Sequence, residues 1–341
     1  MELDAAVRKT AGSEKTMFIT KRILSAILPL LIFGCVFASA QTARPAQQFM
    51  VRASDKSTKP EAKPALGAGS AVMWREPTDI ASRDLFYGPG SKDRLPHGKL
   101  KFIKEDTKGV NPKFNVVDED GTKWGVKFGN EAKPETAATR LVWAVGYFTN
   151  EDYYLADLAV GQLRQKMTRG QNLIEGEKLQ GARFKRRDKG QQEIADWSWD
   201  KNPFVGTKEL DGLKIMMEII CNVDLKSSNQ HVYTTPEGEQ RYIAADLGSS
   251  FGKAGKTMFY SKGKLKDFQS LPLIKNAGPD YIDFWRFSHI PREHAKWIGG
   301  YLAKLSDQQV SDAFRAAQFS PAEVEGFTKK VREKINELQQ L

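Results

Sequence analysis

Two polar motifs separated by a hairpin pattern restrict the fold of this chain more than any other segment. The first, NVDLKSSN, occupies residues 222–229, and the second, DLG, begins at Asp246. The text between them, HVYTTPEGEQRYIAA, is typical of two strands joined by a turn. The stretch before them, TKELDGLKIMMEII, has the apolar period of a helix. The sequence therefore predicts a helix, a polar loop, a hairpin and a strand-end aspartate in that order.

The residue types in these motifs suit phosphate chemistry. Phosphoryl transfer needs a carboxylate that orients the attacking hydroxyl and oxygen ligands for a divalent ion. Asp224 and Asn229 offer one of each, and Lys226 is placed to reach the transferred phosphoryl group. Asp246 offers a second carboxylate, and Gly248 allows a sharp exit from the strand. The alternative is an ordinary polar turn, in which Asp and Asn are common.

The region before these motifs is rich in strand patterns. In KLKFIKED, polar and apolar residues alternate as they do in a strand, and TKGVNPK has the residues of a turn. FNVVDEDGTKWGVKFG reads as a hairpin that turns through Asp120-Gly121. A helix is predicted next in NEAKPETAATRLVWAVGYF, because apolar residues recur there at helical spacing and Asn130 or Glu131 can cap its start.

Lys127 lies on the second strand of this hairpin, just before the predicted helix. A lysine there can reach the phosphates of a nucleotide if a carboxylate holds it. Glu135, in the first turn of the helix, is the candidate partner, and Glu131 is the reserve. The alternative is a solvated surface lysine, which is the usual fate of this residue type.

The remaining patterns complete an α+β fold with two lobes and a cleft between them. We expect helix around 155–167, strands in GARFKRRD and EIADWSW, and several helices after residue 290, with Ser306 and Ser320 as N-caps. The two tryptophans of WSWDKNP suit either core packing or contact with an adenine base.

In this order, the elements and motifs resemble the protein-kinase-like fold. VDLKSSN is similar to the kinase catalytic loop D-L-K-x-x-N, and the DLG at Asp246 is similar to D-F-G. The N-x-D-x4-N form and the small residues of LGSSFG resemble atypical branches, namely HipA-type, phosphoinositide and secretory-pathway kinases. The chain departs from the usual pattern because it lacks G-x-G-x-x-G and the His-Arg pair before Asp224.

This resemblance implies a role for each candidate residue. Lys127 and Glu135 would hold the nucleotide phosphates, and the turn with Gly109 and Lys113 would cover them. The catalytic residues would be Asp224 and Lys226, while Asn229 and Asp246 would bind Mg²⁺ or Mn²⁺. The implied cofactors are ATP, or another nucleotide, and the metal ion. The implied acceptor is a protein, a lipid or a sugar.

The domain limits follow from the N-terminal signal pattern, the composition of the segment after it and the resemblance of the rest. Residues 1–40 would be an N-terminal extension with an export signal, and 41–70 a flexible linker. Residues 71–200 would form the kinase-like N-lobe, and 201–341 the kinase-like C-lobe.

The N-terminus predicts export. Lys21 and Arg22 precede an uncharged apolar run, residues 23–40, which ends in Ala-Ser-Ala. This is the pattern of a cleaved signal, and we expect a periplasmic or extracellular protein. The alternatives are a single membrane anchor and a lipoprotein acylated at Cys35.

The charge distribution and two further motifs argue against other classes of function. The net charge of +10 suits anionic partners, but the basic residues are scattered, so we expect no nucleic acid partner. SFGKAGKT lacks the first glycine of a phosphate-binding Walker loop, and HIPREH lacks zinc-protease spacing. The main rival function is a pseudokinase or ligand-binding module of the same fold without transfer activity, which export favours because ATP is scarce outside the cytoplasm.

Overall fold

The computed structural model describes residues 69–176, 178–188, 190–253, 261–270 and 272–341, which all belong to one unit, residues 60–341. The strands that build its two larger sheets are β1 (Ala71–Val72), β2 (Lys101–Asp106), β3 (Lys113–Val117), β4 (Lys123–Phe128), β5 (Asp152–Ala159), β6 (Ile174–Glu175), β7 (Lys178–Arg187), β8 (Gln192–Asp196), β9 (Gln230–Thr234) and β10 (Gln240–Ala244). The strands of the smallest sheet are β11 (Asn276–Ala277), β12 (Tyr281–Asp283) and β13 (Ile290–Pro291). The helices are α1 (Ala132–Ala144), α2 (Leu163–Lys166), α3 (Lys208–Ile219), α4 (Leu265–Phe268), α5 (Arg292–Leu302), α6 (Asp307–Ala316) and α7 (Pro321–Gln339).

Some predicted segments lie outside the described residues. These are the export signal, the linker up to residue 68, and part of the basic segment after Asp246, residues 254–260. Within the described part of the chain, no helix is both long and apolar enough to cross a membrane.

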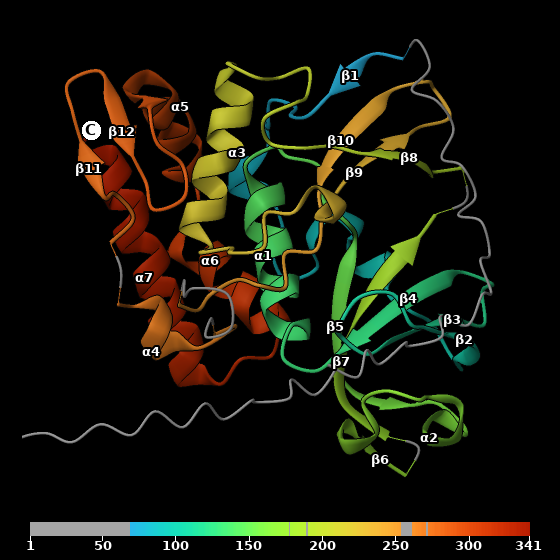
Figure 1. The fold of residues 1–341 in the computed structure, drawn as a ribbon. Coiled ribbons are helices and arrows are strands. Elements are labelled where there is room, and N and C mark those ends of the chain that lie inside the picture. Colours follow the sequence, from blue (N-terminus) through green and yellow to red (C-terminus); the bar gives the residue numbers. More distant parts are fainter. Residues whose placement is uncertain (1–68, 177, 189, 254–260, 271) are drawn as a thin grey trace, which may run out of the picture. The chain divides into compact units, whose positions relative to one another are not determined.

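The largest sheet is antiparallel and has the strand order β2-β3-β4-β7-β5, with β6 paired to β7 (Figure 1). Its two faces differ because successive side chains on a strand point to opposite sides. One face buries an apolar cluster that includes Phe114, Trp124, Val126 and Phe184. The other face carries polar residues, among them Lys127, and this is the face that forms the candidate site.

A second sheet brings the polar motifs toward the first. It has the order β1-β10-β9-β8, and the hairpin of β9 and β10 separates the two motifs, as the sequence predicts. The short strand β1 pairs with β10 in parallel. A third, small sheet is formed by β11, β12 and β13.

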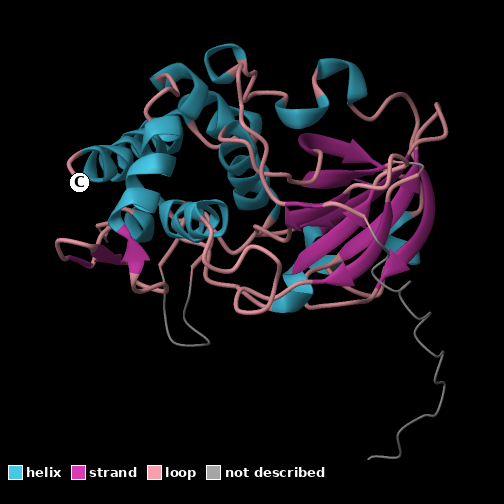
Figure 2. Ribbon diagram, turned by 90° about the horizontal axis from the view of Figure 1, so that it is seen from above, coloured by secondary structure: helices cyan, strands magenta, loops and turns pink. Residues whose placement is uncertain are grey.

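Helix α1 connects the strand-rich and helical parts of the fold. It packs against β5 and β7 on one side and against α6 on the other. Figure 2 shows most strands gathered on one side of the described unit and most helices on the other. A separate apolar cluster fills the helical part. The predicted α+β fold, with a β-rich N-terminal part and a helical C-terminal part, is confirmed.

The predicted helix around 155–167 is wrong. Strand β5 occupies Asp152–Ala159, and α2 is a single turn. β5 pairs with β7 along its length and buries Tyr153 beside Trp124. Pairing with a central strand outweighs a weak helical pattern, because strand formation depends on cross-strand neighbours more than on local preference.

Both predicted N-caps are confirmed. The side chains of Ser306 and Ser320 each accept a hydrogen bond from the backbone N–H of the third residue of the helix that follows. The side-chain oxygen of that residue accepts one from the backbone N–H of the cap. We expect Ser320→Ala to lower the free energy of unfolding by about 0.5–2 kcal/mol, because backbone N–H groups of α7 lose their acceptor. Urea denaturation measures this. Ser320→Thr keeps the oxygen and should cost less, so an equal loss in both variants would contradict the capping role.

Candidate active site

Lys127 is the centre of the candidate site. It lies near the end of β4, and its side chain is only 6% exposed. Its Nζ lies 2.8 Å from Glu135 Oε2 and 3.2 Å from Glu131 Oε2, both contributed by the start of α1. It also lies 2.5 Å from Asp246 Oδ1, which follows β10. The predicted partner and its reserve therefore both contact the lysine.

Arg183 and Asp152 extend this ion-pair network, and the sequence analysis missed both. Arg183 on β7 stands directly across from Lys127 in the strand register. Its Nη2 lies 2.9 Å from Glu135 Oε1, and its Nη1 lies 3.8 Å from Asp152 Oδ1. Thr139 of α1 donates a hydrogen bond of 3.0 Å to Asp152. Glu135 is thus held between two buried cations, which fixes its side chain toward the strand.

Lys127 and Asp246 keep their ionised forms in this network, whereas burial raises the pKa of Glu135. Burial disfavours the charge on Lys127, but the neighbouring carboxylates of Glu135, Asp246 and Glu131 outweigh it and raise the pKa of Lys127 above its usual value. Burial also opposes ionisation of Asp246. The charge of Lys127 and the hydrogen bond from it outweigh this effect and lower the pKa of Asp246 to about 2. The site thus presents an ammonium group and a carboxylate side by side at neutral pH.

The backbone around Asp246 explains the DLG motif, with one correction. The residue in the left-handed region is Asp246 itself, with φ of 50°, whereas Gly248 has no positive φ. Gly248 is required for another reason: a Cβ at that position would lie 2.7 Å from Cβ of Glu131. The glycine therefore allows the segment after β10 to approach the start of α1, which brings Asp246 to Lys127.

The loop that carries the first motif is hydrogen-bonded to the segment after Asp246. The amide of Val223 donates to Ser249 O at 3.2 Å. Asp224 has a side chain that is 24% exposed and lies 3.1 Å from Nζ of Lys226, which is 73% exposed. Asn229 is buried, and its Nδ2 donates to Asp224 O. The structure places Asp224, Lys226 and Asn229 on one loop, but no ion pair or hydrogen bond among the described residues joins them to Lys127 or Asp246.

Two of these residues have the chemistry of a divalent cation site. Magnesium takes oxygen ligands, mainly carboxylates and carbonyls. The carboxylate of Asp246 is 41% exposed, and because the nitrogen of the Asn229 amide is engaged, its oxygen is the atom it can offer. A three-carboxylate cluster of Glu131, Glu135 and Asp246 is also present. That cluster surrounds the ammonium group of Lys127, so it suits a lysine better than a metal ion.

The predicted phosphate-covering turn joins β2 to β3. Gly109 sits in it with φ of 70°, and Lys113 begins β3 with its Nζ 4.0 Å from Asp106 Oδ2. Arg169, which the sequence did not reveal, donates to Gly109 O at 2.6 Å and to Asp106 O at 2.5 Å. The turn is therefore held by a residue sixty positions later in the chain.

A cavity of about 120 Å³ lies beside this network. Lys113, Lys127 and Asp246 line it, but Gly109, Asp224 and Asn229 do not. The other residues that line it are Asp106, Phe114, Asn115, Gly125, Val126, Glu135, Asn150, Arg183, Lys185, Arg187, His231 and Ala245.

Trp197 and Trp199 do not line this cavity. They are 3% and 8% exposed and belong to the apolar cluster of the helical part. The centroids of their rings lie 5.0 Å apart. Of the two roles considered for them, core packing is the one that the structure shows.

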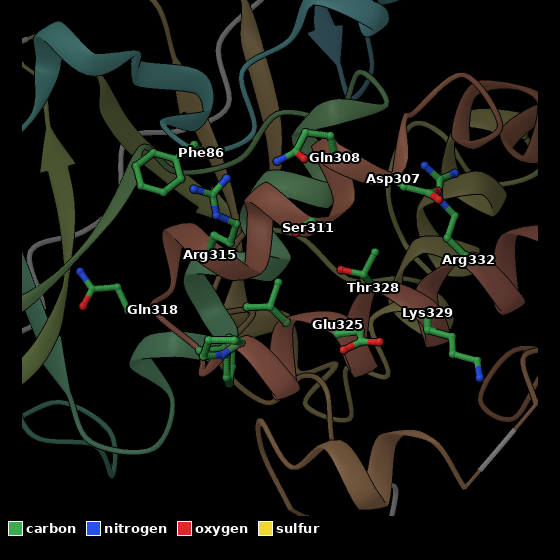
Figure 3. Close-up of a pocket in the computed structure, with 13 residues that line it drawn as sticks. Phe86, Asp307, Gln308, Ser311, Arg315, Gln318, Glu325, Thr328, Lys329 and Arg332 are labelled. Atoms are coloured by element: carbon green, nitrogen blue, oxygen red, sulfur yellow. The ribbon is translucent and has the colours of Figure 1, made fainter.

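A larger hollow of about 960 Å³ lies between α6 and α7 (Figure 3). Arg315 and Ser311 face it from α6, and Thr328 and Lys329 face it from α7. None of the predicted site residues lines it. The charged network around Lys127 lies at the smaller cavity, which makes that cavity the candidate for chemistry despite its size.

Comparison with known proteins identifies kinases among solved structures. A Helicobacter pylori proinflammatory kinase, CtkA, is matched with 11% identity over 70% of this chain and 95% of that chain, with a TM-score of 0.45. The Golgi casein kinase is matched with 11% identity over 76% of this chain and 82% of that chain, with a TM-score of 0.35. No family model and no curated protein matches the chain. The chain itself has a strand lysine, a helix glutamate, a polar loop, a hairpin and a strand-end aspartate in the order that the resemblance to kinases implies.

Proposed function

We propose that this protein is a metal-dependent phosphotransferase that takes a phosphoryl group from ATP or another nucleotide. The observation that carries the proposal is the position of the Lys127 ammonium group, in contact with Glu135 on α1 and with Asp246 after β10. Phosphoryl transfer depends mainly on charged groups held in position. Lys127 supplies a fixed positive charge, and the ionised Asp246 beside it supplies a negative charge. The site of action that the N-terminal sequence predicts is periplasmic or extracellular.

The residues of this chain have distinct roles in the proposed step. Lys127 binds phosphate oxygens, and Glu135 keeps it in place. Asp224 accepts the proton of the acceptor hydroxyl and orients its oxygen toward the terminal phosphorus. The bond between that phosphorus and the bridging oxygen breaks, a bond to the acceptor oxygen forms, and the nucleoside diphosphate leaves with the bridging oxygen. Lys226 neutralises charge on the transferred group.

A divalent ion, Mg²⁺ or Mn²⁺, would be held by Asp246 and Asn229. When bound, it would neutralise the negative charge of the phosphate groups.

The second candidate function is nucleotide or phosphate-ligand binding without transfer. One observation favours it: the carboxylate of Asp224 is ion-paired with Lys226 and is not hydrogen-bonded to the Lys127 network. In that case the fold would bind its ligand through Lys127 and Lys113, and Asp224 would have no chemical role.

Calorimetry and a transfer assay on the purified full-length chain distinguish these functions. We expect ATP to bind more tightly with Mg²⁺ or Mn²⁺ than without. Asp246→Asn should remove this metal dependence, while Asp224→Ala should lower transfer by roughly 10²–10⁴-fold with little effect on binding. Asp120→Asn, at an exposed hairpin turn, is the matched control.

The acceptor assay should present protein, lipid and sugar hydroxyl groups. Metal-dependent binding with no transfer to any of them would favour the binding module. The absence of nucleotide binding, with and without metal, would contradict transfer from a nucleotide and nucleotide binding alike.

A further inference from the structure

The polar face of the largest sheet carries a row of cations. Arg183, Lys185 and Arg187 alternate along β7 and therefore share one face. In the strand register, Arg183 stands across from Lys127, and Lys127 stands across from Lys113. All five of these side chains line the cavity beside the candidate site. The positive charge thus continues beyond Lys127 toward the end of β7.

The cations at the far end of this row differ from those near Lys127. Lys127 and Arg183 have carboxylate partners, whereas Lys185 and Arg187 have none within 4.0 Å among the described residues. The Nζ of Lys185 lies 3.4 Å from the hydroxyl of Tyr233. Burial, and then repulsion by Arg183, lower the pKa of Lys185 to about 8. An anion in the cavity would relieve this repulsion.

The part of the cavity near Lys185 is poorly suited to a nucleobase. Pockets for organic ligands have mostly apolar walls. Most side chains that line this cavity are charged or polar, and Phe114 and Val126, which border it, belong to the apolar cluster on the opposite face of the sheet. At Gly125, a Cβ would lie 3.2 Å from Arg187 Nη2, so the guanidinium group covers the strand where a base would lie. His231 also lines the cavity.

We infer that the row of cations from Lys127 to Arg187 binds a condensed phosphate chain longer than that of a nucleoside triphosphate, with its reacting end in the cavity, and that the phosphoryl donor is inorganic polyphosphate. This inference rests on the proposed phosphoryl transfer and replaces the nucleotide by polyphosphate as its donor. Lys127 and Lys113 bind the reacting end of the chain. Lys185 and Arg187 bind phosphate groups farther along it, since arginine and lysine are the residues that best recognise phosphate oxygens.

The dimensions agree with an extended anion. Arg187 lies four residues beyond Arg183 on β7, and four residues of a strand span roughly 13 Å. A row of cations of that length matches a chain of several linked phosphate groups. A nucleoside triphosphate would instead place its uncharged sugar and base against Lys185 and Arg187.

The transfer step is balanced without another reactant. The bond between the terminal phosphorus and its bridging oxygen breaks, and a bond forms between that phosphorus and the acceptor hydroxyl oxygen. The shortened polyphosphate leaves with the bridging oxygen. The hydroxyl proton passes to Asp224 and then to solvent.

Binding measurements on the full-length chain test the inference. The probes are ATP, inorganic tripolyphosphate and a long-chain inorganic polyphosphate, measured by calorimetry at one salt concentration. We expect the long chain to bind most tightly per molecule. Arg187→Gln should weaken long-chain binding roughly tenfold, because one charge-assisted contact is lost, and should leave tripolyphosphate binding nearly unchanged. Arg187 is exposed, so the variant should fold.

Arg186→Gln is the matched control. It makes the same change of charge at the neighbouring residue, whose side chain points to the opposite face of β7 and contacts Trp124. Equal weakening by both substitutions would show that the chain binds only through the general positive charge, and would overturn the inference.

The pH dependence gives a second readout. Lys185 is charged below pH 8 and loses its charge above it, so long-chain affinity should fall between pH 7 and pH 9. Lys185→Arg stays charged over this range and should flatten the profile. A pH-independent affinity in the unsubstituted protein would contradict the role of Lys185. The other charged or titratable groups that face Lys185 are Arg183 and Arg187 on β7, Asp152 on β5, Glu135 on α1, and Tyr233 and His231 on β9.

The transfer assay separates this inference from the proposed function. Transfer from polyphosphate in preference to ATP supports both. Transfer from ATP alone overturns the inference and leaves the function intact. Tight, Arg187-dependent chain binding without transfer from either donor supports the cation row and contradicts the transfer function.

Discussion

Lys127→Met is expected to lower phosphoryl transfer by roughly 10²–10³-fold, because the variant loses the cation that binds the reacting phosphate. The buried carboxylates of Glu131 and Glu135 and the partly exposed carboxylate of Asp246 lose their shared counter-ion in the same step. The pKa of Asp246, which is about 2 in the intact site, should therefore rise. A transfer assay measures the first effect, and carboxyl titration by NMR measures the second.

The control for this variant is Lys101→Met, at an exposed position of β2. It should leave both transfer and the pKa of Asp246 unchanged. If Lys127→Met retained full transfer while its Asp246 pKa rose, the ion pairs would be structural and the proposed role of Lys127 in phosphate binding would be wrong.

The low pKa of Asp246 also predicts an acid limit of stability. Its pKa is lowered from a usual 3.8 to about 2, so the ionised group stabilises the fold above pH 4 and this contribution is lost as the pH falls toward 2. The carboxylate is 41% exposed, which limits the size of the effect.

Arg183→Met is expected to lower the free energy of unfolding by about 3–5 kcal/mol, because it leaves two buried carboxylates without their guanidinium partner. Glu135 is 2% exposed and Asp152 is 1% exposed, so water cannot replace the lost interactions. Urea denaturation measures the change, and circular dichroism should show whether the variant still folds at 25 °C.

Arg75→Met is the matched control for this prediction. Arg75 is 61% exposed and pairs with Glu239 at 2.6 Å, and an exposed pair contributes less than about 1 kcal/mol. Similar losses in the two variants would contradict the view that burial makes the Arg183 network important.

The elements of the fold could be predicted wherever a local pattern was strong. The β3–β4 hairpin, α1, α3 and the capped helices α6 and α7 all follow from turn residues, periodicity or capping serines within short stretches. Strand β5 could not be predicted in this way. Its pairing with β7 depends on residues about thirty positions away, and no pattern within 152–159 reports that partner.

The candidate site likewise contains residues that the sequence could indicate and residues that it could not. Lys127, Glu135 and Asp246 could be proposed from sequence, because each belongs to a short motif placed at the end of a predicted strand or the start of a helix. Arg183 and Arg169 could not, because a single basic residue has no local signal for the partner it will meet. The alternation of basic residues in RFKRR was the only available hint of a charged sheet face.

The sequence by itself determined the order of the elements with strong local patterns, and which of them carry carboxylates, amides and lysines, because helices, turns and hairpins are specified by neighbouring residues. Only the tertiary structure decided that Lys127, Arg183 and Asp246 meet, and that Lys185 and Arg187 extend their charge along one face. The physical reason is strand register, which aligns residues more than fifty positions apart and is set by burial of the opposite, apolar face of the sheet.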